Sequence, residues 1–264
     1  MLRALYSSAT GMKAQEYVID VTANNLANVN TNGFKKSMVD FADLMYLTGK
    51  QAGTEVSTGQ QTPIPFQIGS GVRAVGTTKA FSSGTFEQTG NPFDTAIEGD
   101  GFFKVTLPSG ADRYTRDGSF KIDSQGRLVN SDGYLVDGGI TISEDVQADQ
   151  IHIGTDGTVS ANDPSTGTSS ALGTIPLYRF VNPAGLSSAG GNLFAATSAS
   201  GAEIGGTAAQ PGFGTIRHRF VERSNVEVVT ELISLISAQR AYEINSRAVR
   251  AADEMLSVTA DIVR

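Results

Sequence analysis

The chain ends in the stretch SNVEVVTELISLISAQRAYEINSRAVRAADEMLSVTADIVR, residues 224–264, which contains neither glycine nor proline. Apolar residues recur along it every seven positions: Val228, Leu235, Tyr242, Val249, Leu256 and Val263. Ala238 and Ala252 lie three residues after two of these positions. Apolar residues at this spacing form a narrow seam that packs against a partner helix. The stretch therefore predicts one helix of about 60 Å, given a rise of about 1.5 Å per residue.

The start of this predicted helix has the sequence of a capping box. Ser224 and Glu227 stand three residues apart, directly before the apolar seam. In a capping box, the serine hydroxyl accepts a hydrogen bond from the backbone of the third residue, and the carboxylate there reaches back to the backbone of the serine. We therefore predict that Ser224 caps the helix and that Glu227 completes the box.

A second seam runs through the first 28 residues, where Leu5, Met12, Ile19 and Leu26 are seven apart. Three further apolar residues precede members of this seam by three positions: Leu2, Ala9 and Ala23. Gly11 lies inside this predicted helix and costs about 1 kcal/mol relative to alanine, so a packing partner is implied. Two seams, one at each end of the chain, predict that the terminal helices pair like a coiled coil and also meet other copies. This pattern indicates assembly rather than catalysis.

Composition limits the classes of protein that remain. The net charge is -7 and the acidic excess lies between the two helical ends, which argues against nucleic-acid binding. The chain has no cysteine, which excludes disulfides, cysteine-based zinc sites and thiol nucleophiles. No segment has the roughly 18 apolar residues that span a membrane. Residues 1–19 lack the apolar run of a signal peptide, so export is expected to use a route without a cleaved signal.

The middle of the chain carries strand and turn signals. Short apolar runs flank the pairs Asp117-Gly118, Asp132-Gly133 and Asp156-Gly157, and each pair predicts a hairpin. Small and polar residues dominate three segments that we expect to be irregular, namely 47–70, 162–174 and 184–212. The predicted class is α+β, with the terminal helices in an inner domain and an inserted all-β outer domain. The expected boundaries are 1–33 with 223–264 for the helical domain, 34–83 with 205–222 for a connecting region, and 84–204 for the all-β domain.

Candidate catalytic and metal-binding residues are few. His152 and His218 are the two histidines, and they would form a metal site only if both converged with a carboxylate. A Ser-His-Asp triad is not supported, because the sequence has no G-x-S-x-G elbow. Asp94, Glu98 and Asp100 lack the spacing of a calcium-binding loop and are expected to be turn residues. We predict no catalytic, cofactor or metal site, although a carboxylate pair for glycosidic cleavage stays open.

Several stretches resemble one known family. Residues 23–35, with the sequence ANNLANVNTNGFK, are similar to the signature of the bacterial flagellar rod and hook proteins. Gly99–Phe103 and Tyr114–Phe120 resemble the core motifs of that family's β domain, and Ser224–Val226 with Gln239–Ser246 resembles its C-terminal helix motif. The N-terminal signature residues are Asn24, Asn25, Leu26, Ala27, Asn28, Asn30, Thr31, Gly33 and Phe34.

The resemblance implies a structural subunit of a rigid helical tube in the flagellar basal body. Such a tube spans the periplasm, transmits motor torque to the hook and encloses the export channel, with terminal helices lining the channel and β domains facing outward. The implied partners are other copies of the chain, the proximal rod proteins and the hook protein along the axis, the P-ring and L-ring around it, and the flagellar type III export apparatus. No cofactor, no nucleic acid and no membrane insertion are implied.

Chain length and the pattern Gln67–Arg73 resemble the distal part of the rod. The alternatives are a hook-type subunit, a subunit at the proximal–distal junction of the rod, and an enzyme such as a peptidoglycan hydrolase. The resemblance places residues 47–66 where hook proteins differ most from the distal rod. We therefore expect this segment to stiffen the tube through contacts with adjacent subunits.

Overall fold

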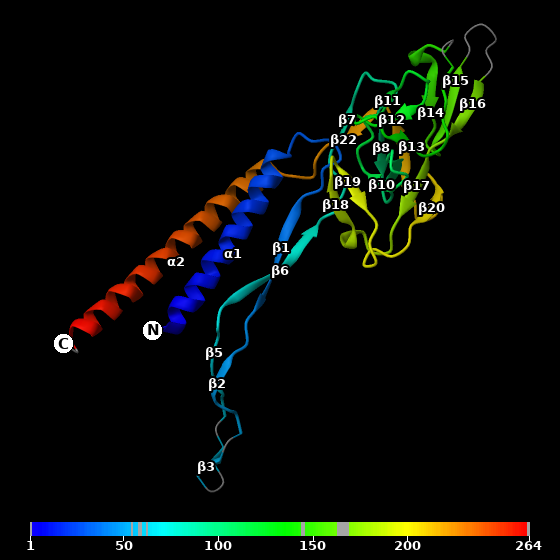
Figure 1. Ribbon diagram of the computed structural model, residues 1–264. Helices are drawn as coiled ribbons and strands as arrows, with labels where there is room; N and C mark the ends of the chain where they lie inside the picture. Colours follow the sequence, from blue (N-terminus) through cyan, green and yellow to red (C-terminus); the bar gives the residue numbers. More distant parts are fainter. Residues whose placement is uncertain are drawn as a thin grey trace. The chain divides into compact units, whose positions relative to one another are not determined.

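The computed structural model describes residues 2–53, 55–57, 60–61, 63–143, 146–162 and 169–262. Within these residues two long helices enclose a series of short strands in the chain order, so the predicted α+β class is confirmed (Figure 1). Helix α1 covers Leu2–Ala27 and helix α2 covers Val228–Ile262. Neither of these helices is long and apolar enough to cross a membrane.

The chain divides into two compact units. The helical unit consists of Met1–Ala27, Ser37–Thr78 and Glu227–Arg264, and the β unit consists of Asn28–Lys36 and Lys79–Val226. These boundaries differ from the expected ones in two ways. Residues 28–33 and 205–226 group with the β unit, and most of the expected connecting region 34–83 groups with the helices.

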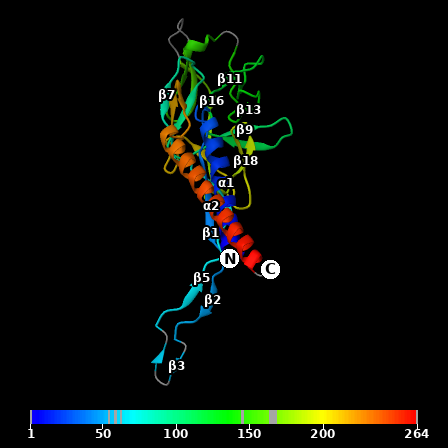
Figure 2. The same cartoon turned by 90° about the vertical axis from the view of Figure 1, so that its left-hand side faces the viewer.

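In the helical unit α1 and α2 run antiparallel and side by side, and both chain ends lie at the same end of the pair (Figures 1 and 2). Small or polar side chains are buried on both helices: Ala14, Thr22 and Asn25 on α1, and Glu231, Ala238 and Ala252 on α2. Small residues let two helix backbones approach closely, so this face forms the intramolecular contact.

The segment after α1 forms an arm of nested two-stranded ladders within the helical unit, pairing β1 with β6, β2 with β5 and β3 with β4. Its strands are β1 (Ser37–Asp43), β2 (Leu47–Lys50), β3 (Glu55–Ser57), β4 (Gln60–Gln61), β5 (Phe66–Ile68) and β6 (Val72–Lys79). The prediction of an irregular segment at 47–70 is wrong for these strands. The backbone N–H and C=O groups of these strands form hydrogen bonds across the ladders, which the polar composition of the segment did not predict.

A seven-stranded sheet dominates the β unit, in the order β11-β12-β13-β9-β10-β19-β18. Its strands are β9 (Phe103–Thr106), β10 (Asp112–Thr115), β11 (Lys121–Ile122), β12 (Leu128–Val129), β13 (Leu135–Val136), β18 (Ser187–Gly190) and β19 (Leu193–Ala195). A three-stranded sheet joins β14 (Ile151–Ile153), β15 (Thr158–Asn162) and β16 (Ser169–Thr174). Three pairs complete the unit: β7 (Phe86–Gln88) with β22 (Phe220–Glu222), β8 (Thr95–Glu98) with β21 (Thr215–His218), and β17 (Pro176–Arg179) with β20 (Ile204–Thr207).

Two of the three predicted hairpins are confirmed. Strands β12 and β13 pair across Asp132-Gly133, and β14 pairs with β15 across Asp156-Gly157. The hairpin at Asp117-Gly118 is wrong, because β10 pairs with β9 and β19 while β11 pairs with β12. Here the Asp117 N–H donates to Thr115 Oγ1 in a local turn, which directs the chain away from β10.

Strands also occupy segments that were expected to be irregular near the end of the β unit. Residues 184–212 contain β18, β19 and β20, and residues 162–174 contain β16. The expected connecting region 205–222 also contains the strands β21 and β22. Residues 163–168 lie outside the described part. Short strands rich in glycine, alanine and serine carry little apolar alternation, so their pairing comes from neighbouring strands rather than from a local pattern.

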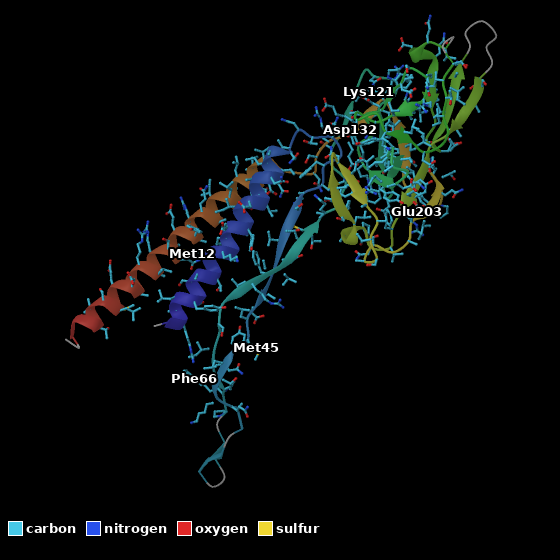
Figure 3. All side chains as sticks on the ribbon, viewed as in Figure 1. Met12, Met45, Phe66, Lys121, Asp132 and Glu203 are labelled. Atoms are coloured by element: carbon cyan, nitrogen blue, oxygen red, sulfur yellow. The ribbon has the colours of Figure 1, made fainter. Side chains whose placement is uncertain are left out.

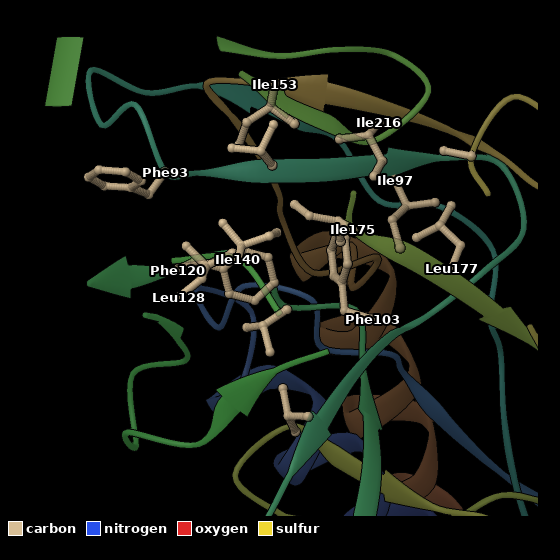
Figure 4. Packing of buried hydrophobic residues seen from close by; sticks show 14 of the residues in the cluster. Phe93, Ile97, Phe103, Phe120, Leu128, Ile140, Ile153, Ile175, Leu177 and Ile216 are labelled. Carbon is tan, nitrogen blue, oxygen red and sulfur yellow. The ribbon is translucent and has the colours of Figure 1, made fainter. Parts of the chain in front are cut away.

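Apolar side chains that lie between Phe93 and Ile216 in the sequence form one buried core in the β unit (Figure 4). Phe103 from β9 and Phe120 from the loop before β11 meet edge to face, with ring centroids 5.0 Å apart. Ile97 and Ile216, from the paired strands β8 and β21, are fully buried in the same cluster. A smaller aromatic cluster joins Phe102, Tyr114, Phe180, Leu186 and Phe194. These cores give the β unit its own source of stability.

Candidate assembly site

The contact between α1 and α2 has a defined register. A β-carbon at Gly11 would lie 3.0 Å from Nδ2 of Asn245, so the glycine lets the Asn245 side chain approach the α1 backbone. Further along the pair, Asn25 Nδ2 donates a hydrogen bond to Glu231 Oε2 at 3.2 Å. Polar residues buried between two helices fix their register, because a shift would leave them buried without partners.

Asn25 also joins α1 to the first strand of the arm. Its Oδ1 accepts from the Ser37 N–H at 2.9 Å, and its Nδ2 donates to the Ser37 carbonyl oxygen at 2.9 Å. The side chain therefore behaves as an extra backbone group beside β1. Both Asn25 and Glu231 are buried, so each needs these partners. One residue of the signature thus connects α1, α2 and β1 within the helical unit.

The structure places the predicted N-terminal seam outside the most buried face of α1. Leu5, Met12, Ile19 and Leu26 are all half-buried, whereas Ala14, Thr22 and Asn25 are buried. The face toward α2 therefore contains small and polar residues, which a pattern of large apolar residues does not reveal.

The predicted C-terminal seam lies only partly on the packed face of α2. Leu235, Val249 and Leu256 are half-buried, but Val228 and Tyr242 are 40% and 42% exposed. Val263 lies outside the described residues. A strict seven-residue repeat drifts by about 20° per heptad around a straight α-helix, so no single partner covers every member. Within one chain, Val228 and Tyr242 are therefore left uncovered, and their place in contacts between copies stays a prediction.

A second apolar stripe on α2 faces away from this contact. Its members follow helical spacing along the first half of the helix: Val229, Ile233, Ile236 and Ile244. Ile233 is 60% exposed and Ile244 is 65% exposed. We call these four residues the outer stripe. The spacing of Val229, Ile233 and Ile236 could have revealed it, because residues i, i+4 and i+7 share a helix face.

The helix cap is not where the sequence predicted it. Helix α2 begins at Val228, and the Glu231 N–H donates to the Glu227 carbonyl oxygen at 3.0 Å. Ser224 Oγ accepts from the Val226 N–H at 3.3 Å instead of from Glu227. The Glu227 carboxylate accepts from the Thr230 hydroxyl at 2.9 Å. The capping box at Ser224 and Glu227 is therefore wrong.

The intervening Asn225 explains this shift. Its Oδ1 accepts from the Lys36 N–H at 2.8 Å, and its Nδ2 donates to the Ala80 carbonyl oxygen at 2.8 Å. These bonds bind Asn225 to neighbouring backbone within the β unit and hold residues 224–226 outside the helix. A helix cap contributes only about 1 kcal/mol. The two hydrogen bonds between the Asn225 side chain and the backbone of Lys36 and Ala80 therefore outweigh a cap at Ser224.

The second half of the signature forms a turn in the β unit. Gly33 has φ +67°, and a β-carbon there would lie 2.5 Å from the Asp117 backbone nitrogen. Asn32 Nδ2 donates to Ser119 Oγ at 3.0 Å. A positive φ and such close packing are met by glycine alone. The N-terminal signature is therefore fastened to the Tyr114–Phe120 motif.

The remaining signature residues take varied positions. Asn24, Ala27 and Asn30 are exposed, while Asn28, Thr31 and Phe34 are half-buried. Thr31 Oγ1 donates to Asn28 Oδ1 at 3.2 Å within the turn. The Lys79 Nζ lies 5.2 Å from the centroid of the Phe34 ring. The signature therefore builds the turn and its packing rather than one continuous surface.

Directly after the turn lies a buried ion cluster that the sequence did not predict. Lys35, Arg116 and Glu222 are each at most 2% exposed. Lys35 Nζ lies 2.6 Å from Glu222 Oε1, and Arg116 Nη1 lies 3.5 Å from Glu222 Oε2. One carboxylate therefore compensates two buried cations. Lys35 and Arg116 belong to the resembling stretches, but nothing local connects them with Glu222.

Hydrogen bonds to the backbone support this cluster, while Arg116 Nε and Glu222 Oε2 are buried without a hydrogen-bond partner in the described part of the chain. Lys35 Nζ donates to the Ser82 carbonyl oxygen at 2.8 Å, and Arg116 Nη2 donates to the Gly99 carbonyl oxygen at 2.9 Å. The Gly84 N–H donates to Glu222 Oε1 at 2.9 Å. Burial lowers the pKa of Lys35 and of Arg116, and the nearby Glu222 opposes both shifts. The cluster is structural, since its charged atoms are buried against one another.

The prediction that the candidate carboxylates are turn residues is wrong for two of them, because Asp94 is buried and forms a β-bridge with Ser119, and Glu98 is the last residue of β8. Glu98 Oε2 lies 2.7 Å from Arg217 Nε, and Asp94 Oδ1 accepts from Asn91 Nδ2 at 2.8 Å. The arm, in contrast, presents large apolar side chains: Met45 is 89% exposed, and Phe66 is also exposed (Figure 3). The described residues thus place uncovered apolar surface on α2 and on the arm, as expected for a subunit of an assembly.

Three protein-family models of flagellar rod and hook proteins match this chain. The family model described as flagella basal body rod protein matches residues 5–35, that of the flagellar hook protein FlgE/F/G D1 domain matches 96–161, and that of the flagellar basal body rod FlgEFG protein C-terminal matches 217–262. The flagellar basal-body rod protein FlgG of Borreliella burgdorferi is 45% identical over 264 residues, all of both chains. FlgG of Caulobacter vibrioides is 41% identical over 262 residues, 99% of each chain.

The flagellar hook protein FlgE of Helicobacter pylori is 41% identical over 146 residues, which is 55% of this chain but 20% of the hook protein. The chain therefore belongs to the flagellar basal-body rod and hook protein family. Within that family it is a structural subunit of the flagellar distal rod, since similarity to the rod protein runs the full length of the chain.

Proposed function

We propose that the chain builds the rod by packing the outer stripe of α2 against helices of neighbouring copies around the export channel. The exposure of Ile233 and Ile244 carries this proposal. A helix of 35 residues that has α1 as its helical partner leaves this apolar face in water in a single copy. Burying such a face on assembly contributes about 25 cal/mol per Å² of apolar surface.

The antiparallel pair of α1 and α2 would act as a coiled-coil-like inner domain. Buried Ala238 and Ala252 support this arrangement, since they recur at a spacing of fourteen on the packed face of α2. The half-buried Leu5, Met12, Ile19 and Leu26 would become fully covered in the assembled tube. The same holds for Val228 and Tyr242, which one chain leaves exposed.

The arm would add a second set of contacts between subunits. Met45, Ile64 and Phe66 are exposed apolar residues on or beside its strands. Covering them with adjacent copies would oppose the small sliding movements that let a tube bend. A straight, torque-transmitting shaft needs this resistance, whereas a hook-type subunit needs flexibility.

Family membership supports the remaining assignments. The rod would contact proximal rod proteins at one end and the hook protein at the other, turn inside the P-ring and L-ring, and span the periplasm. Subunits would travel unfolded through the flagellar type III export apparatus, which the absence of cysteine favours. We propose a structural rather than an enzymatic role, with no binding of nucleic acid and no membrane insertion.

Charge placed in the outer stripe tests this proposal. Ile233→Asp should abolish polymers seen by electron microscopy and motility in cells, because burying an unpaired carboxylate is strongly unfavourable. Ile233→Val keeps the apolar face and is the matched control. Circular dichroism should show that both variants keep a folded β unit. Polymers of normal length and yield from Ile233→Asp would contradict the assignment of this stripe.

A further inference from the structure

The two histidines of the chain meet in the β unit. His152 is the central residue of β14 and His218 is the last residue of β21. Their ring centroids are 5.3 Å apart, and the ring planes cross at 83°. Neither histidine belongs to the outer stripe, the arm or the two apolar clusters of the β unit. Two histidines from distant strands in one place form a candidate ligand pair, because imidazole binds several transition metals.

Both rings line a surface hollow of about 570 Å³. The other polar side chains around it are those of Asp149, Gln150, Asn162 and Arg219. His152 is exposed and His218 is half-buried, so an ion could reach both from solvent. The Arg219 cation opposes a bound metal ion, and the exposed Asp149 carboxylate, 3.9 Å from Arg219, offsets it.

The orientation of His218 is fixed by a backbone group. His218 Nε2 lies 2.7 Å from the Pro92 carbonyl oxygen. A carbonyl oxygen accepts, so Nε2 donates its hydrogen and Nδ1 keeps the lone pair of the neutral ring. Histidines that bind metals commonly donate their other N–H to a carbonyl or carboxylate in this way. Burial lowers the pKa of His218, the bond to the Pro92 carbonyl oxygen opposes this shift, and His152 and Arg219 add smaller lowering contributions, so the neutral ring that binds a metal ion is favoured.

The spacing of the rings also fits one shared ion. Two imidazoles that bind a tetrahedral zinc ion at about 2.0–2.1 Å have ring centres about 5 Å apart. We propose that His152 and His218 form a binding site for a divalent transition-metal ion such as Zn²⁺. Among the described residues, no group of three or more histidine, cysteine, aspartate or glutamate side chains converges here. Water would therefore complete the coordination shell, and the site would be open.

Calorimetric titration of untagged, full-length protein with ZnCl₂ at pH 7.5 tests the site. The expected result is one Zn²⁺ per chain, with the affinity reduced at least about tenfold in His152→Ala and in His218→Ala. Cu²⁺ should bind more tightly than Zn²⁺, following the usual order of affinities. Binding should weaken at pH 5.5, because protons compete for both imidazoles.

Controls separate this site from weak binding to carboxylates. Asp253→Asn removes an exposed carboxylate of α2 and should leave Zn²⁺ affinity unchanged. His152→Ala changes an exposed side chain, so its circular dichroism spectrum should match that of the parent even if His218→Ala disturbs folding. Equal Zn²⁺ binding by the parent and by His152→Ala would overturn the proposal, as would the absence of measurable binding by the parent. Either result leaves polymer formation, and hence the rod assignment, untouched.

Discussion

Gly11 of α1 lies directly against Asn245 of α2, and a β-carbon at position 11 would be 3.0 Å from the Asn245 amide nitrogen. This contact and the bond between Asn25 and Glu231 set the antiparallel register of the two helices. A glycine inside a helix lowers its intrinsic stability by about 1 kcal/mol. Close packing against Asn245 explains why a glycine is present at position 11.

A double-mutant cycle tests the contact. Gly11→Leu should destabilise the helix pair by about 1–3 kcal/mol through overpacking and reduce polymer yield. Asn245→Ala removes the clashing amide and should recover part of that loss when combined with Gly11→Leu. The measurement is the urea dependence of helical circular dichroism in assembled protein. Purely additive effects of the two changes would show that the residues do not touch.

The buried ion cluster should respond strongly to the loss of its one carboxylate. Glu222→Gln leaves Lys35 and Arg116 buried without a compensating charge, and should lower the unfolding free energy of the β unit by about 3–5 kcal/mol. Glu98→Gln breaks the exposed pair with Arg217 and should cost less than about 1 kcal/mol. Chemical denaturation of both variants measures the difference. Similar losses in the two would contradict the role assigned to Glu222.

Stability of the β unit should fall in mild acid because of His218. Burial lowers the pKa of His218 in the folded state, the hydrogen bond to the Pro92 carbonyl oxygen partly opposes this, and His152 and Arg219 lower it slightly further. The unfolded chain, with a histidine pKa of about 6.5, therefore binds more protons than the folded chain just below that pH. The stabilisation is fully present above the unfolded-state pKa of about 6.5 and is lost progressively as the pH falls from that value through the lower folded-state pKa. Thermal unfolding at pH 5.5 and 7.5 measures this loss, and His218→Gln should flatten it; an unchanged slope would exclude His218 as the cause.

The arm should control stiffness rather than assembly. Phe66→Ser removes an exposed ring from β5 and should still allow polymers, but these should bend more. The reason is that lost apolar contacts between neighbours lower the resistance to sliding. Persistence length from electron micrographs is the measurement. Lys50→Ser, on the paired strand β2, is a control that leaves the apolar surface intact. Equal stiffness of the Phe66→Ser polymer and its parent would make the arm a passive connection.

The helices were predictable because apolar periodicity over more than 25 residues is a strong local signal. The faces by which α1 and α2 pack against each other were less predictable. A strict seven-residue spacing selects large apolar residues, whereas the observed contact uses Gly11, Ala238 and Asn245. The turn at Asn32-Gly33 was visible locally as an Asn-Gly pair, and the motif over residues 23–35 was specific enough to indicate the family.

Long-range polar relationships could not be predicted from one sequence. Glu222 lies far along the chain from Lys35, and no periodic pattern connects them. The same holds for His152 and His218, whose meeting depends on the placement of two short strands. The predicted cap at Ser224 is wrong because the Asn225 side chain forms hydrogen bonds with the backbone of Lys36 and Ala80. A local capping motif contains no information about such distant partners.

The central claim is that the outer stripe of α2 is buried between copies in the rod. Because the chain has no cysteine, Ile233→Cys introduces a single thiol at the centre of this stripe. The measurement is its rate of reaction with a maleimide reagent in the monomer and in the assembled polymer, with Lys121→Cys on the β unit as a reference. We predict rapid reaction in the monomer and strong protection on assembly. A thiol at position 233 that reacts equally fast in both states would contradict the account.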